Sequence, residues 1–152
     1  MGSKKLAGIL GSCIVLIIAV VAIGTLSPKP VTDYTTLLRY LRDSSVSIAE
    51  EGAIDEEFLD IVGKKVAVNE STIQVYEYAN VEAMESEASW VSSDGFSIRK
   101  EKEGGIWEIC HVNWIASPHF YKAGRIIVIY VGEDNSIISL LENALGTQFA
   151  GM

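Results

Sequence analysis

Cysteine is almost absent from this chain of 152 residues. Cys13 lies in a long apolar run near the N-terminus, and Cys110 is the only cysteine after it. A disulfide between them would require the apolar segment around Cys13 to lie against the domain that contains Cys110. We therefore expect no intrachain disulfide. Apolar residues make up 49% of the sequence, which is enough for a packed domain held together by its core.

Basic residues are also few. The chain has 12 Lys and Arg against 20 Asp and Glu, for a net charge of −8. Three of the basic residues, Lys4, Lys5 and Lys29, precede residue 31, so residues 31–152 keep 9 basic and 20 acidic side chains, a net charge of −11. Nucleic acid phosphates and anionic lipid surfaces would repel such a domain, which argues against both as its partners.

Familiar catalytic and metal-binding motifs are missing. The sequence has no G-x-S-x-G, no phosphate-binding glycine loop ending in Lys-Ser/Thr, no H-E-x-x-H and no C-x-x-C. The acidic residues between Glu50 and Asp60 lack the alternating spacing and central glycine of a calcium loop. We therefore predict no enzyme, no cofactor and no metal site.

The N-terminus carries a run of 21 residues, Leu6 to Leu26, without a charge. As a helix it would span roughly 31 Å, the thickness of a bilayer core. Lys4 and Lys5 precede it, which predicts a cytoplasmic N-terminus. The expected organisation is a cytoplasmic end over residues 1–5, a single-pass anchor in the cytoplasmic membrane over 6–26, a proline-containing linker over 27–31 and an extracytoplasmic domain over 32–152.

Two other interpretations of this segment stay open. A secretory signal could be cleaved after the small residues near Val20 to Gly24. Alternatively, Leu10-Gly11-Ser12-Cys13 is similar to a lipobox, in which Cys13 would be lipidated. All three interpretations place the domain outside the cytoplasm, and length and flanking charge favour the uncleaved anchor.

The remaining sequence predicts an α+β domain. Apolar spacing indicates helices that begin after Thr32 or Asp33, at Val81 and at Ser136. The expected strands lie at 46–49, 58–62, 66–68, 73–78, 96–99, 107–116 and 125–131. The strand at 125–131 is apolar on both faces and should be central. We expect a ferredoxin-like or related sandwich, with a largely antiparallel sheet and helices on one face.

Three polar residues between Ser117 and Arg125 form the main candidate site. His119, Tyr121 and Arg125 would lie in a turn that enters the central strand, where they could line a ligand pocket. In the alternative interpretation this is a structural turn, in which Phe120 fills the core and Arg125 pairs with a carboxylate. Tyr76 and Tyr78 would form an aromatic patch if their sheet face were open, and core otherwise.

Cys110 and His111 are the other residues with catalytic chemistry. Neighbouring residues of a strand point to opposite faces, so the two cannot form a nucleophile and base pair or share a metal. Cys110 alternates with apolar Val112 and Trp114, which indicates an inert buried thiol.

Several stretches together resemble a known family: 73–78, Ser93-Asp94-Gly95, Trp114, 118–121, 124–132 and 145–151. The chain resembles small exported prokaryotic proteins, many of them described as lipoproteins, with no assigned activity. The resemblance covers residues 34–151. It implies a membrane-attached, extracytoplasmic single domain and identifies no catalytic residue.

The expected function is that of a membrane-tethered, non-enzymatic accessory module, which binds another protein of the cell envelope or a second copy of itself. A small-ligand or sensory domain, with His119, Tyr121 and Arg125 lining its pocket, is the alternative. An envelope hydrolase is the third and weakest hypothesis, because no nucleophile and base pair was found.

Overall fold

The structure is a computed structural model that describes residues 30–54 and 58–152. The anchor expected at 6–26, Cys13 and most of the linker lie outside the described residues.

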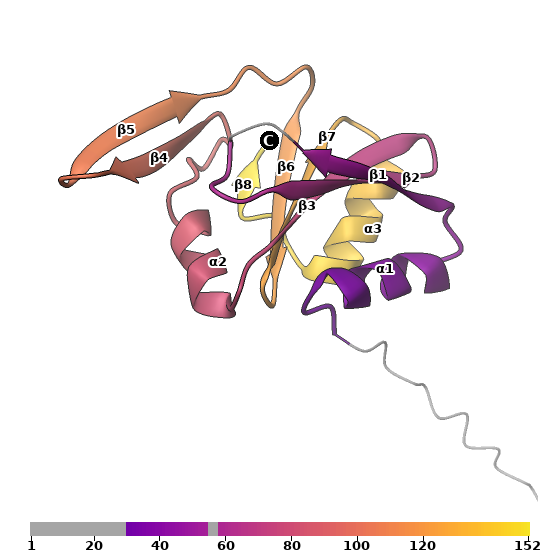
Figure 1. Cartoon of the computed structure of the whole chain (residues 1–152). Helices are drawn as coiled ribbons and strands as arrows, with labels where there is room; N and C mark the ends of the chain where they lie inside the picture. Colours follow the sequence, from indigo (N-terminus) through magenta and orange to yellow (C-terminus); the bar gives the residue numbers. More distant parts are fainter. Residues whose placement is uncertain (1–29, 55–57) are drawn as a thin grey trace, which may run out of the picture.

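The domain is built on a six-stranded antiparallel sheet (Figure 1). Its order is β1-β2-β3-β7-β6-β8, and every neighbouring pair is antiparallel. The strands are β1 (Ile48–Ile54), β2 (Gly63–Val68), β3 (Ser71–Glu77), β6 (Pro118–Ala123), β7 (Ile126–Val131) and β8 (Ala150–Gly151). The antiparallel α+β class predicted from the sequence is confirmed.

Two helices cover one face of this sheet, α1 (Tyr34–Asp43) and α3 (Asn135–Leu145). Asp33 begins α1 with a capping box, because its side chain accepts the Thr36 N–H at 2.8 Å while the Thr36 hydroxyl accepts the Asp33 N–H at 3.0 Å. The expected apolar stripe of α1 is buried against the sheet. In α3, Ile137 and Leu141 are buried, and the other apolar residues of the stripe are half-buried. The two helices and their sheet face form the first hydrophobic core.

The opposite face is covered by α2 (Val81–Ala88) and by a separate hairpin of β4 (Ser97–Lys102) and β5 (Ile106–His111). Met84 and Ala88 of α2 and Ile98 of β4 enter the second core, together with Phe58, Phe120 and Tyr76. In Figure 1 the hairpin projects from the body at the end away from residue 30, with β5 as its outer strand.

The strand predicted to be central, β7, is confirmed as such. Ile126, Val128 and Tyr130 belong to the first core, whereas Ile127 and Ile129 belong to the second. All five are buried, so β7 is covered on both faces.

The expected placement of the helices on one face is wrong. Because β3, β6 and β7 present buried side chains to both sides, one layer of helices could not cover them, and α2 packs on the face opposite α1 and α3. The ferredoxin-like topology also differs from the one observed, since that fold is made of two βαβ halves, whereas every pair of neighbouring strands described in this sheet is antiparallel.

The structure differs from the sequence prediction at residues 58–62, 107–116 and 117–125. Residues 58–62 form turns rather than a strand, and the consecutive residues Phe58 and Leu59 are both buried, which the alternation of a half-buried strand does not allow. The segment expected as a turn, by contrast, contains β6. Its residues from Pro118 to Tyr121 are all buried because both sides of β6 are covered, so it has no alternating pattern. The strand expected at 107–116 ends at His111.

Candidate functional site

His119 is a structural residue of the sheet. It is buried on β6, where Nδ1 lies 2.8 Å from Oε1 of Gln148 and Nε2 lies 3.0 Å from the carbonyl oxygen of Gly132. Its ring stacks on Tyr130 with a centroid distance of 5.9 Å. Both ring nitrogens therefore have partners within the fold.

Tyr121 and Arg125 do not join His119 in a pocket. Tyr121 is fully buried in the first core, and burial raises the pKa of its hydroxyl to about 12. Arg125 follows the far end of β6, where its guanidinium pairs with Glu77 at 2.8 Å and donates to the carbonyl oxygen of Tyr78 at 3.2 Å. Two parts of the structural-turn alternative are present, a buried Phe120 and a carboxylate partner for Arg125, although residues 118–123 form the strand β6 rather than a turn.

Tyr76 and Tyr78 share one sheet face, but this face is closed. Both rings are buried in the second core. The Tyr76 hydroxyl donates to Oε1 of Gln74 at 3.0 Å, and burial raises the pKa of Tyr78 above its usual range. No open aromatic patch forms there.

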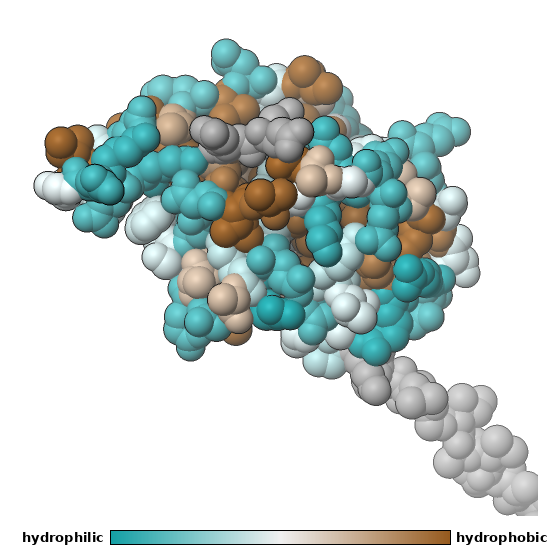
Figure 2. Space-filling view, viewed as in Figure 1, coloured by the Kyte–Doolittle hydropathy of each residue, from teal (hydrophilic) through white to brown (hydrophobic). Residues whose placement is uncertain are grey.

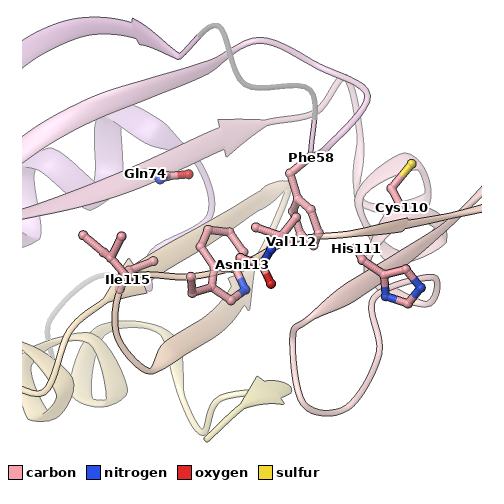
Figure 3. A pocket seen from close by; sticks show the side chains of 9 residues that line it. Phe58, Gln74, Cys110, His111, Val112, Asn113 and Ile115 are labelled. Carbon is pink, nitrogen blue, oxygen red and sulfur yellow. The ribbon is translucent and has the colours of Figure 1, made fainter.

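A cavity of about 600 Å³ lies where β5 leaves the hairpin (Figure 3). It is lined by Phe58, Gln74, Val131 and every residue from Cys110 to Ile115. Figure 3 shows the side chains of Cys110 and His111 pointing away from one another, as expected for neighbours on a strand. The cavity therefore brings no nucleophile and base together.

The hairpin itself is fastened to the body by several contacts. Ile98 of β4 is fully buried in the second core, and Lys100 pairs with Asp60 at 2.9 Å. The backbone N–H of Asp60 in turn donates to the Glu87 carboxylate of α2 at 2.9 Å. These contacts fix the direction in which the hairpin projects.

The hairpin and the segment after it expose several apolar side chains. Ile106, Trp107 and Ile109 of β5 are 66%, 49% and 58% exposed, and Ile115 beyond the strand is 99% exposed. Figure 2 shows apolar surface at the outer end of the hairpin, set among hydrophilic atoms. Trp107 and Ile109 are two positions apart and share one face of β5, whereas Ile106 lies on the opposite face.

Trp107 is held in place on this face. Its ring meets Trp90 edge to face at a centroid distance of 5.8 Å, and the Arg99 guanidinium lies 5.7 Å from its centre. Beside them is a cavity of about 260 Å³ whose lining includes Trp90, Arg99 and Ile109. Trp and Arg are enriched among the residues that dominate interface energies. We call Trp90, Arg99, Trp107, Ile109 and the outer edge of β5 the hairpin surface.

The hydrogen bonds of adjacent residues show which backbone N–H and C=O groups of β5 point away from β4. In antiparallel strands, opposite residues alternate between pairs that bond to each other and pairs whose N–H and C=O point outward. Val112 N–H donates to the carbonyl of Phe96 at 2.9 Å, which makes this a bonded pair. By this alternation, Arg99 and Ile109 form a pair whose backbone groups point outward. In agreement, the N–H of Arg99 donates not to β5 but to the carbonyl oxygen of Trp90, at 3.0 Å.

The same alternation turns the backbone groups of Trp107, Ile109 and His111 outward on β5. Within residues 30–54 and 58–152, no strand pairs with this side of β5. The hairpin surface therefore combines apolar side chains with backbone donors and acceptors that have no strand partner.

The two edges of the main sheet are built differently. β1 carries Glu50 and Glu51 and is interrupted by a β-bulge between Glu50 and Gly52. β8 at the other edge has only two residues. Charge, bulges and short length all discourage pairing with another chain, and β5 has only one acidic residue, Glu108, and no bulge.

Glu87 beneath the hairpin gives a testable dependence of stability on pH. Burial, the main cause, raises the pKa of its carboxyl group above the usual 4.5. The folded state therefore binds the Glu87 proton more tightly than the unfolded state does. The stability that this proton contributes is lost as the pH rises from 4.5 through the raised pKa. We expect Glu87→Gln to increase the free energy of unfolding at pH 7, since it removes the buried charge while its amide oxygen still accepts the Asp60 N–H.

The measurement is urea unfolding of Glu87→Gln and of the unchanged protein between pH 4 and pH 8. The variant should have the larger free energy of unfolding above pH 4.5, and the difference between the two proteins should vanish below that pH. A variant that is less stable at every pH would show that the charge of Glu87 is required.

The sequence pattern predicts none of the residues of the hairpin surface as site residues. Its only signal was that Trp107, Ile109 and His111 share the strand face opposite Cys110. Alternation identifies such a face, but whether another element covers it depends on contacts between distant parts of the chain.

In the described part of the chain, no group of three or more His, Cys, Asp or Glu side chains could hold a metal ion. None of the helices described there is both long and apolar enough to cross a bilayer. No protein-family model, curated protein or solved structure matches the chain.

Proposed function

We propose that this protein is a non-enzymatic protein-binding module of the cell envelope, and that the hairpin surface is where it binds. The observation that carries the proposal is the concentration of exposed apolar residues on β5, around a tryptophan held by Trp90 and Arg99. A rigid aromatic residue beside a small cavity is typical of the centre of a protein interface.

The N-terminal sequence supports an extracytoplasmic, membrane-tethered setting. Leu6 to Leu26 has the length of a membrane-spanning helix, and the two lysines before it favour a cytoplasmic N-terminus. The hairpin lies at the end of the domain away from residue 30 (Figure 1). A tether would therefore hold the domain near the membrane while the hairpin surface faces other proteins.

The small-ligand alternative has less support. Its three candidate residues do not converge, because His119 and Tyr121 are buried within the sheet and Arg125 lies beyond the far end of β6. Each already has a role in the fold.

The test is photo-crosslinking of the full-length protein in membranes. A photoreactive amino acid at Ile109 should give a discrete adduct, whereas the same residue at Glu70, exposed in the turn between β2 and β3, should not. Trp107→Ala should reduce the Ile109 adduct about tenfold, which corresponds to a loss of about 1.4 kcal/mol of binding energy. Equal labelling from both positions, or no adduct from Ile109, would refute the proposal.

A further inference from the structure

We infer that the hairpin surface binds a second copy of this chain, with β5 pairing antiparallel to β5 of the other copy about a twofold axis at Ile109. The inference rests on the proposed function, since it names the partner of the same surface. It is carried by three observations: the direction of the edge groups, the charge of the hairpin and the residues that this alignment brings together.

The outward backbone groups suit a twofold pair. They belong to Trp107, Ile109 and His111, which are spaced two apart along β5. With the axis at Ile109, this residue pairs with its own copy, and Trp107 pairs with the copy's His111. Every outward N–H and C=O of the three residues then finds a partner, as in an ordinary antiparallel ladder.

The charge distribution favours a second copy at this place. Residues 31–152 carry a net charge of −11, so two copies repel each other over most of their surfaces. Residues 97–116 are an exception, because three acidic side chains are balanced by three basic ones, Arg99, Lys100 and Lys102. Contact through the hairpin therefore brings together two segments that have no net charge.

The side chains in this alignment are compatible. On the outer face, Ile109 lies beside its copy and Trp107 lies beside His111. On the other face, Glu108 lies opposite Cys110. A shift of the axis to Glu108 would place two carboxylates directly opposite each other, which is destabilising. The apolar and aromatic pairs are of the kind that stabilises neighbouring strands.

Engineered cysteines test this alignment. In full-length protein in membranes with Cys110→Ser, Ile109→Cys should form a covalent dimer under mild oxidation, because paired residues place their Cα atoms about 5.5 Å apart, within disulfide range. Trp107→Cys alone should not, since the two copies of residue 107 would be about 13 Å apart along the strands. Cys13 is present in both variants, so any crosslink through it appears equally in both.

The double variant Trp107→Cys/His111→Cys controls for the loss of the tryptophan. It should dimerise, because the alignment places each new cysteine opposite one from the other copy. No covalent dimer from Ile109→Cys, or equal amounts from Ile109→Cys and Trp107→Cys, would overturn the inference.

A second measurement needs no crosslink. In sedimentation of the full-length protein in detergent, Ile109→Lys should weaken dimerisation at least about tenfold, since it places two positive charges at the axis. Ile115→Lys is the matched control, because Ile115 is 99% exposed and lies outside β5. Equal dimerisation of the two variants, or a protein that is monomeric throughout, would contradict a second copy as the partner.

The photo-crosslinking experiment separates this inference from the proposed function. An Ile109 adduct with the mass of two copies of the chain supports both. A discrete adduct that contains only a different protein would preserve the proposed function and overturn the inference. The absence of any adduct would overturn both.

Discussion

Replacing Phe120 with alanine should lower the free energy of unfolding by about 3–5 kcal/mol, the usual cost of removing a large buried side chain. Phe120 is fully buried in the middle of β6. Its ring lies 5.9 Å from that of Phe58 and 6.0 Å from those of Trp114 and Phe149, measured between centroids. The substitution removes the shared neighbour of three aromatic residues from distant parts of the chain.

Chemical denaturation followed by tryptophan fluorescence would measure this loss. Domains of this size are typically stable by about 5–15 kcal/mol, so the variant should be weakly folded at 25 °C. Ile115→Ala is the control, because its side chain is 99% exposed and its removal should change stability by less than about 0.5 kcal/mol. A loss below about 1 kcal/mol for Phe120→Ala would contradict this description of the second core.

The second large effect is expected at Gly124, between β6 and β7. Its φ of +53° is unfavourable for other residues, and an added Cβ would lie 2.2 Å from the carbonyl oxygen of Thr32. This carbonyl accepts the N–H of Arg125 at 2.9 Å, so the clash would also break that bond. We expect Gly124→Ala to cost about 2–4 kcal/mol.

Gly104→Ala is the matched control for Gly124→Ala. Gly104 has a φ of +82°, but an added Cβ would meet no atom within 4 Å. It should cost only the conformational penalty of about 1–2 kcal/mol. Thermal unfolding of both variants would measure the difference, and equal costs would show that Thr32 moves away without penalty.

The sequence predicted the elements whose pattern is local. α1 and α3 follow from apolar spacing and from capping residues that stand next to them, Asp33 and Asp134. β7 is predicted by a continuous apolar run, a pattern typical of a strand that is buried on both faces. These signals depend on residues within a few positions of each other.

The segments that it missed depend on distant partners. Pro118 to Tyr121 gave no alternating pattern, since both sides of β6 are covered by elements from elsewhere in the chain. The sequence predicts His119 as a candidate ligand residue because it does not show that Gln148 contacts Nδ1 of this histidine. Gln148 lies 29 residues further along the chain. Predicting the hairpin surface would require knowing that Trp107 and Ile109 stay about half exposed in the folded domain.

The position of β7 also determines how the domain should lose its structure. Its alternate side chains fill both hydrophobic cores, with Val128 in one and Ile129 in the other. If either layer separates from the sheet, β7 is exposed on that side and the other layer loses its support. The two cores should therefore melt as one cooperative unit, whereas β5, which within the described residues pairs with β4 alone, can open without them.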